Sequence, residues 1–259
     1  GAARGRLIAA ARAVTVPGRL SLAQDIDDVL RRPGLAPELR CLALLHGAAC
    51  AGRFDALPAL LAAAPVLGLP LADPRVAETA LQVVAYGGFP RAIEVLTHLH
   101  RARGRPAAPG SGEPGEPGKS ETSGAPGGRE PTDDPRAQDA ARGRRVWDAI
   151  YKDLAQDVLA TLEDLHPGLP GLVLEDAYGA ILARPGLSLA ERELFAVAAL
   201  ALMALPAPLG SHIRGALRNG SNAPAVMDIL DTCRVLADPA ALAVLAQAQD
   251  RLSRSVYRP

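Results

Sequence analysis

The chain has 259 residues, 49% of them hydrophobic and 22% charged, which is enough for a sizeable core. Lys and Arg together number 28, as do Asp and Glu, so no net field favours nucleic acid as a partner. No apolar run reaches the ~18 residues of a membrane span, which argues against a membrane partner. Aromatic residues are only 3%, so Ala, Leu and Val must build the core; Ala and Leu are the best helix formers, which predicts an all-α fold.

The first part of the chain, residues 1–103, has the pattern of short helices separated by proline and glycine. Ser21 opens the sequence S-L-A-Q, a capping-box pattern with Gln24 in the reciprocal position. Asp73 is placed to cap a helix with Pro74 in its first turn, where the missing N–H of proline costs nothing. We expect helices over about 6–14, 21–32, 37–52, 73–87 and 90–101, with further helical sequence from 55.

The composition changes abruptly between Pro106 and Pro135, where the sequence reads PAAPGSGEPGEPGKSETSGAPGGREPTDDP. Gly, Pro, Ser, Glu and Thr dominate, and such a segment cannot bury enough apolar surface to offset its ordering entropy. We therefore expect a disordered linker over 104–137. It separates an N-terminal half, residues 1–103, from a C-terminal half, residues 138–259.

The C-terminal half begins with an expected helix through Trp147 and Tyr151 that continues to Pro167-Gly168. Ser188-Leu-Ala-Glu191 is a second capping box, and the strongly apolar sequence after it predicts a core helix to about 205. A glycine stop follows a helix expected over 211–220. Three other helices are expected: one spans 171–183, one begins at about 222 and the last begins at about 238.

Residues 186–230 read GLSLAERELFAVAALALMALPAPLGSHIRGALRNGSNAPAVMDIL. Arg192-Glu193-Leu194, the Ala/Leu helix, the segment S-H-I-R-G-A-L-R-N-G and the capped helix after it resemble the core helical hairpin of the carboxymuconolactone decarboxylase family. Upstream, Tyr178-Gly179 and the sequence at 184–187 resemble the family's approach to this hairpin. In the first half, residues 85–92 resemble the Y-x-G-F-P segment that follows the hairpin in single-domain members.

The resemblance implies an alkylhydroperoxidase D-like helical bundle, here with two related halves. Glu38-Leu39 is a candidate degraded copy of Glu193-Leu194. Nineteen residues after Glu38 stands Leu57, whereas nineteen after Glu193 stands His212, so the first half is expected to have lost the histidine. Members of the family form symmetric oligomers, often trimers or hexamers. We therefore expect a homo-oligomer, in which the two halves of each chain pair as a pseudo-dimer.

The family covers two chemistries. One is the cofactor-free decarboxylation of a carboxylated muconolactone in aromatic catabolism. The other is the peroxidase-type redox chemistry of alkylhydroperoxidase D-like members, which needs a C-x-x-C pair with a histidine four residues after the second cysteine. Relative to His212 those cysteine positions hold Leu205 and Pro208, and neither residue can form the thiolate that the reaction requires. The resemblance therefore favours a lyase without a cofactor over a redox protein.

The three cysteines are Cys41, Cys50 and Cys233. Their odd number and unpaired spacing argue against a disulfide framework and indicate a reducing compartment, so we expect a cytoplasmic location. His98 and His100 are two residues apart and point to different faces of a helix, so we expect no metal site there.

The resemblance and side-chain chemistry together suggest Glu193 and His212 as catalytic residues, on successive helices of an antiparallel hairpin. Loss of carbon dioxide from a small carboxylated lactone or keto acid needs a general acid and a donor or cation at the developing enolate charge. Arg192 and Arg214 are candidates to bind the substrate carboxylate bidentately. Tyr178 is a further candidate donor.

Each of these residues also has an interpretation without catalysis. Glu193 lies near a helix N-terminus, where the macrodipole stabilises a carboxylate, and His212 fits a buried structural histidine. Arg214 fits a solvated helical face with Arg218, and residues 86–90 fit a turn between helices. The third hypothesis, beside the lyase and the redox protein, is thus a non-catalytic helical oligomer that has kept the fold.

Overall fold

The computed structural model describes residues 21–104 and 135–254. The expected helix at 6–14 and nearly all of the expected linker lie outside these residues. Every regular element in the two described stretches is a helix, which confirms the all-α prediction. Within those stretches no helix combines the length and apolar content that a membrane crossing requires.

Several helices begin at the predicted caps. Ser188 forms both bonds of its capping box with Glu191, whereas Ser21 accepts only the backbone N–H of Gln24, because the Gln24 side chain donates to Asp28 instead. The elements are α1 (Leu22–Leu30), α2 (Pro37–Ala51), η1 (Phe54–Ala56), α3 (Leu57–Val66), α4 (Pro74–Ala102), α5 (Pro135–Tyr151), η3 (Lys152–Leu154), α6 (Ala155–Leu165), α7 (Leu169–Leu172), η4 (Val173–Leu182), α8 (Leu189–Leu202), α9 (Pro206–Arg218), α10 (Ala223–Cys233) and α11 (Pro239–Ser253).

Helix α4 consists of two arms that meet at Gly88. This residue has φ 79° and ψ 171°, a backbone conformation that glycine adopts without strain, and Pro90 follows in the first turn of the second arm. The Arg103 side chain at the far end donates to the carbonyl oxygen of Leu71 at 2.9 Å, so the second arm runs back toward the start of the first. The predicted helix end at residues 87–88 is therefore confirmed as a reversal of the chain.

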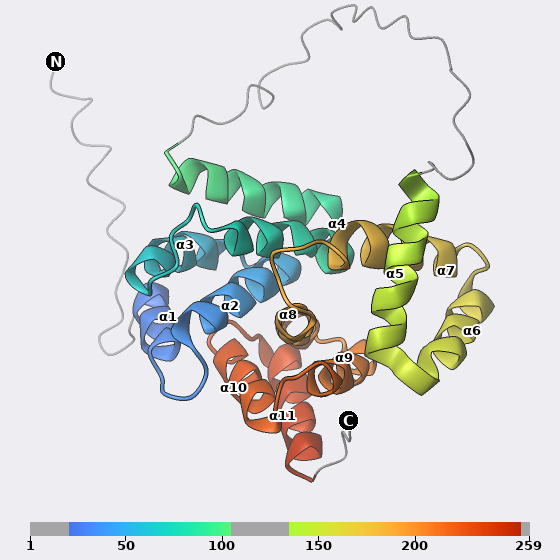
Figure 1. Cartoon of the computed structure of the whole chain (residues 1–259). Helices are drawn as coiled ribbons and strands as arrows, with labels where there is room; N and C mark the ends of the chain where they lie inside the picture. The colour runs from blue at the N-terminus through green and yellow to red at the C-terminus, as the bar shows by residue number, and fades with distance from the viewer. Residues whose placement is uncertain (1–20, 105–134, 255–259) are drawn as a thin grey trace, which may run out of the picture.

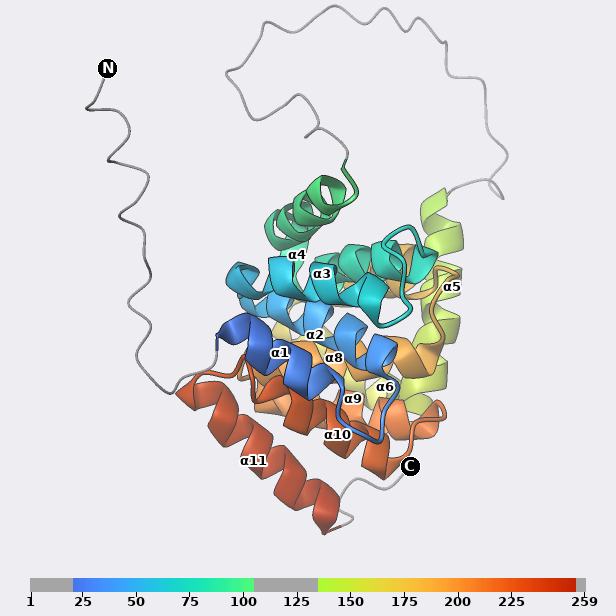
Figure 2. The same ribbon diagram turned by 90° about the vertical axis from the view of Figure 1, so that its left-hand side faces the viewer.

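The helices form three layers, with α2 and α8 in the middle (Figures 1 and 2). Helices α3 and α4 lie on one side of this pair and α9, α10 and α11 on the other. The two central helices are in close contact at Gly47, where an added Cβ would lie 3.2 Å from the backbone of Ala198. One continuous hydrophobic core extends from Ile26 to Leu252, so the two halves pack against each other rather than standing apart.

A smaller lobe, formed by α5, α6, α7 and η4, leans against α9 and the first arm of α4 (Figure 1). Its own core contains Trp147, Tyr151 and Tyr178. The prediction of one helix from 138 through Tyr151 to 167 was wrong, because the chain turns at Lys152, which has a positive φ of 51°. That turn ends α5, starts α6, and brings the aromatic side chains of α5 to the inner side of the lobe.

Helix α9 begins at Pro206, earlier than the predicted start at 211. Pro206 and Pro208 both fall in its first turn, where backbone N–H groups have no partner within the helix, so prolines are tolerated. The shift matters for function because it moves His212 from the start of the helix to its interior.

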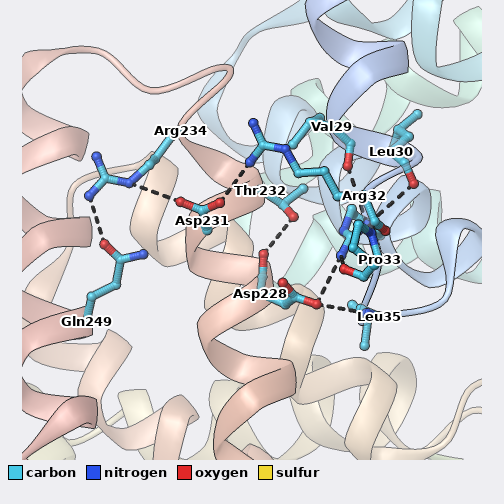
Figure 3. A network of polar contacts seen from close by, with 11 residues as sticks. Val29, Leu30, Arg32, Pro33, Leu35, Asp228, Asp231, Thr232, Arg234 and Gln249 are labelled. Carbon is cyan, nitrogen blue, oxygen red and sulfur yellow. Dashed lines mark hydrogen bonds and ion pairs between the residues drawn. The ribbon is translucent and has the colours of Figure 1, made fainter.

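A buried arginine on α2 links the two halves of the chain (Figure 3). Arg40, only 1% exposed, donates to the carbonyl oxygen of Arg32 at 2.6 Å and forms an ion pair with Asp228 of α10 at 3.0 Å. Asp228 also accepts the backbone N–H of Leu35 at 2.7 Å. Arg32 itself pairs with Asp231 on the next turn of α10 at 2.8 Å, so two acids of the second half hold the loop before α2.

A second buried arginine also links the halves, but here the second half supplies the arginine and the first half the acid. Arg192 of α8, also 1% exposed, donates to the carbonyl oxygen of Arg184 at 2.8 Å and pairs with Glu78 of α4 at 3.5 Å. It also donates to the side-chain oxygen of Gln82 at 3.0 Å, and the Gln82 amide donates back to the carbonyl oxygen of Arg192. Its guanidinium is therefore engaged by α4 and by the loop before α8.

Candidate active site

Glu193 and His212, predicted as a pair from the family resemblance, are in direct contact. Nδ1 of His212 lies 3.0 Å from Oε2 of Glu193, and both side chains are buried. A carboxylate can only accept a hydrogen bond, so with Glu193 ionised Nδ1 carries the proton and donates it. Nε2 of His212 is then the nitrogen left for a ligand. This arrangement, a base oriented by a buried acid, can transfer a proton to or from a bound molecule.

Gly215 makes the contact possible. It lies one turn after His212 on α9, and a Cβ built there would overlap Oε2 of Glu193 and lie 3.1 Å from Ile150. The carboxylate therefore rests against the backbone of α9 in space that only a glycine leaves open. The other carboxylate oxygen, Oε1, is buried and has no hydrogen-bond partner among the described residues.

His212 lines a cavity of about 530 Å³ between the smaller lobe and the main bundle. Small-molecule sites typically have volumes of ~300–1,000 Å³. Among the described residues that line this cavity there is no Asp, Glu, Lys or Arg. The lining consists of Ala85, Tyr86, Trp147, Tyr151, Val158, Thr161, Leu162, Leu165, Val173, Ala177, Tyr178, Leu182, Ala207, Pro208, Ser211 and His212.

Tyr86 reaches the cavity from the N-terminal half. Its ring lies edge-on to His212, with the centroids 5.5 Å apart, and its buried hydroxyl has no hydrogen-bond partner among the described residues. Burial, and then the negative charge of Glu193, hold the pKa of this hydroxyl well above its usual range, so it stays protonated and can donate. Sequence reasoning assigned residues 86–90 to a turn; Gly88 does break the helix, but the role of Tyr86 in the cavity was missed.

Tyr178, the predicted further donor, belongs to the smaller lobe and also lines the cavity. Its hydroxyl donates to the hydroxyl of Tyr151 at 3.2 Å, and burial raises the pKa of both groups. Because Tyr178 donates to Tyr151, the proton of Tyr151 is free to point elsewhere. Trp147 packs against both tyrosines, and its indole N–H donates to the carbonyl oxygen of Ala155 at 3.0 Å.

The two arginines suggested for substrate binding lie in different places. The Arg192 guanidinium is held by Glu78, Gln82 and the carbonyl oxygen of Arg184 and does not line the cavity. Arg214, half-buried on α9, donates to the hydroxyl of Ser211 at 3.2 Å, and Ser211 does line the cavity. The structure thus brings Arg214 to the margin of the site and directs Arg192 toward the interface between the halves.

The cysteines lie apart from His212 and from one another. All three are free and buried, and burial raises the pKa of Cys41 and of Cys233 to about 12 and that of Cys50 still higher. Thiols in such surroundings stay protonated at neutral pH and react poorly. Within residues 21–104 and 135–254, no three His, Cys, Asp or Glu side chains are grouped so that they could hold a metal ion.

Comparison with known proteins places a family match over this site. Residues 173–250 match the carboxymuconolactone decarboxylase family, a range that includes η4, α8, α9 and α10 and therefore both Glu193 and His212. A search of curated proteins found no match. The C-terminal half thus contains a carboxymuconolactone decarboxylase family domain, and its helical fold agrees with that assignment.

Proposed function

We propose that this protein is a carboxy-lyase that acts on a small carboxylated lactone or keto acid without a cofactor. The observation that carries the proposal is the buried Glu193–His212 pair at the wall of a cavity that also holds three tyrosines. Decarboxylation leaves an electron pair on the carbon that loses carbon dioxide, delocalised as an enolate. Such a reaction needs a proton donor to that carbon and hydrogen bonds to the enolate oxygen, and both kinds of group are present.

In the proposed reaction His212 enters protonated and Glu193 stabilises the imidazolium. The C–C bond to the carboxylate breaks, carbon dioxide leaves, and its bonding pair becomes the enolate. The Nε2 proton of His212 then moves to the enolate carbon, which restores the carbonyl, and the histidine takes up a proton from water. Arg214 is the cation that we assign to the substrate carboxylate, since its partner Ser211 lines the cavity. Arg192, in contrast, positions α8 and with it Glu193.

The thiol chemistry of alkylhydroperoxidase D-like relatives is the alternative enzyme function, and the cysteines disfavour it. Leu205 and Pro208 stand where the redox pair would be, and the thiols present are buried and protonated. A non-catalytic oligomer is the other alternative. Against it stands the cost of burying an acid with one unpartnered oxygen, which a purely structural core has no reason to keep.

Release of carbon dioxide by the purified protein tests the proposal, with a panel of carboxylated lactones and β-keto acids as substrates. We expect His212→Gln to abolish release while its circular dichroism and melting temperature stay close to those of the unaltered protein. Release that survives in His212→Gln, or absence of release from every substrate, would overturn the proposal. A triple variant with all cysteines replaced should keep its activity; loss of activity there would support the redox alternative.

We also propose that the two halves are copies of one ancestral unit, in a register set by the buried arginines. Arg40 and Arg192 each donate to the carbonyl oxygen of an arginine eight residues earlier, and each pairs with an acid of the other half. This exchange is what a two-fold interface produces. The sequence R-P-G-L precedes both central helices, at 32–35 and 184–187.

In this register Cys41, and not Glu38, corresponds to Glu193. Cys41 Sγ lies 3.5 Å from the carbonyl oxygen of Leu60, nineteen residues on, just as His212 stands nineteen residues after Glu193. The first half thus has a thiol and a leucine where the second has its acid and base. Glu38 lies earlier, in the first turn of α2.

A further inference from the structure

The cavity has a polar end and an apolar body. Its polar groups are His212, Tyr86, Tyr151, Ser211 and neighbouring hydroxyls, whereas aliphatic side chains of α6 and η4 supply much of the remaining wall. His212 is the only described lining residue that can carry a positive charge, and the proposed reaction uses that charge, so a second carboxylate on a ligand would find no cation of its own along this wall. Burying an unpaired charge in this way is strongly unfavourable. The cavity therefore suits a ligand with one polar head and an apolar body.

The hydroxyl of Tyr86 indicates that the polar head of the ligand contains a hydrogen-bond acceptor. It is buried, protonated and without a partner, and unsatisfied donors of this kind are rare in folded proteins. Its ring contacts that of His212, so an acceptor bound to Tyr86 also lies beside the catalytic pair. A carbonyl oxygen is such an acceptor, and in a β-keto acid it stands two bonds from the carbon that receives the proton.

We infer that the substrate is a β-keto acid with a single carboxylate and an apolar ring or chain, whose keto oxygen accepts a hydrogen bond from Tyr86. This inference rests on the proposed lyase function and makes Tyr86 a catalytic residue supplied by the N-terminal half. When carbon dioxide leaves, the keto oxygen takes up negative charge and its hydrogen bond from Tyr86 strengthens. His212 protonates the carbon, and the product is the neutral ketone. The apolar body of the substrate lies against Trp147 and Leu162.

Trp147, the single tryptophan of the chain, lines the cavity and provides a signal for binding that needs no turnover. The probes are acetophenone, which is the ketone expected from benzoylacetate, and ethylbenzene, which has the same carbon skeleton without the carbonyl oxygen. We expect both to change the tryptophan fluorescence, with acetophenone bound about 3–10-fold more tightly, the difference that one hydrogen bond typically makes. In Tyr86→Phe this difference should vanish while the affinity for ethylbenzene stays unchanged.

A comparison of two keto acids tests separately whether the ligand carries only one carboxylate. Benzoylacetate should bind at least 10-fold more tightly than 3-oxoglutarate, in which a carboxymethyl group with a second carboxylate replaces the phenyl ring. Tighter binding of 3-oxoglutarate, or equal affinities of acetophenone and ethylbenzene in the unaltered protein, would overturn the inference whether or not Tyr86→Phe folds. The expected binding pattern without release of carbon dioxide from benzoylacetate would leave the ligand class standing and remove the lyase function. Release of carbon dioxide from 3-oxoglutarate but not from benzoylacetate would support the lyase function and overturn the inferred ligand class.

Discussion

The two central helices carry the same buried arginine but differ in the residue that follows it. On α8 Arg192 precedes Glu193, which contacts His212, whereas on α2 Arg40 precedes Cys41, which contacts the backbone at Leu60. Both arginines are 1% exposed and bind the preceding loop in the same way. In the proposed register the arginine is therefore part of the scaffold and the acid is not, because Cys41 stands where the second half has Glu193.

This contrast separates structure from chemistry within one chain. A buried carboxylate costs several kcal/mol of desolvation unless it is well paired, and Glu193 has one oxygen without a partner. The first half avoids that cost with Cys41 and Leu60, and its core there is apolar. We interpret the acid and base of the second half as retained for a ligand.

The largest expected effect is the difference in activity between a variant of Glu193 and a variant of Cys41, its counterpart in the proposed register. Glu193→Gln removes the charge that stabilises the His212 imidazolium, and we expect activity to fall by about 10²–10⁴-fold, the typical contribution of acid–base catalysis. Cys41→Ala, the matched variant, should leave kcat within about twofold. Steady-state release of carbon dioxide measures both; comparable losses in the two variants would contradict the assignment of roles.

The two arginines, in contrast, should behave alike. Arg40→Met and Arg192→Met each remove a buried cation from an acid and from a carbonyl oxygen, and breaking a buried ion pair typically costs ~3–5 kcal/mol. Each acid keeps one other partner, since Asp228 accepts the N–H of Leu35 at 2.7 Å and Glu78 pairs with Arg184 at 2.9 Å. Asp228 and Glu78 retain some contact with water, so we expect about 3 kcal/mol for each variant. Urea unfolding measures this loss. A destabilisation confined to Arg192→Met would show that the shared geometry does not reflect a shared role.

The fold could be predicted from the sequence because its signals are local. Caps such as Asp73 and Ser188 and the break at Gly88 fix where helices begin and end, and the structure confirms them. The contact of Glu193 with His212 followed from family resemblance. The place of Tyr86 depends on how helices distant in sequence pack, and no local pattern reports that. Sequence reasoning aligned Glu38 with Glu193, although the R-P-G-L segment repeated at 32–35 and 184–187 already indicates the register that the arginine contacts support.

A buried histidine in the first half, His46, makes the stability of the protein depend on pH. Burial lowers the pKa of His46 to about 4, from an ordinary value of 6.5. Below pH ~6.5 the unfolded chain binds a proton that the folded chain does not, so stability falls as the pH drops, by about 3 kcal/mol in total by pH 4. In the proposed register α8 has Ala198 at this position, and His46→Ala should therefore remove this part of the pH dependence.

Unfolding free energies at pH 7, 6 and 5 check this, since both proteins share all their other titrating groups. The unaltered protein should lose about 2 kcal/mol more than His46→Ala between pH 7 and pH 5. If the unfolding free energies of the two proteins changed equally with pH, His46 would bind its proton as readily in the folded protein as in the unfolded chain.

Gly215 should show the smallest effect, and in the proposed register the first half has Ala63 at the corresponding position. A methyl group at 215 would overlap the Glu193 carboxylate, whereas at 63 no acid stands opposite, since Cys41 replaces it. We expect Gly215→Ala to destabilise by about 1–3 kcal/mol, as overpacking of a core does, and to move Glu193 away from His212. Thermal unfolding and the rate of carbon dioxide release report the two effects. In Gly215→Ala combined with Glu193→Cys the overlap with the carboxylate disappears and only the close contact with Ile150 remains, so most of the stability should recover while activity does not.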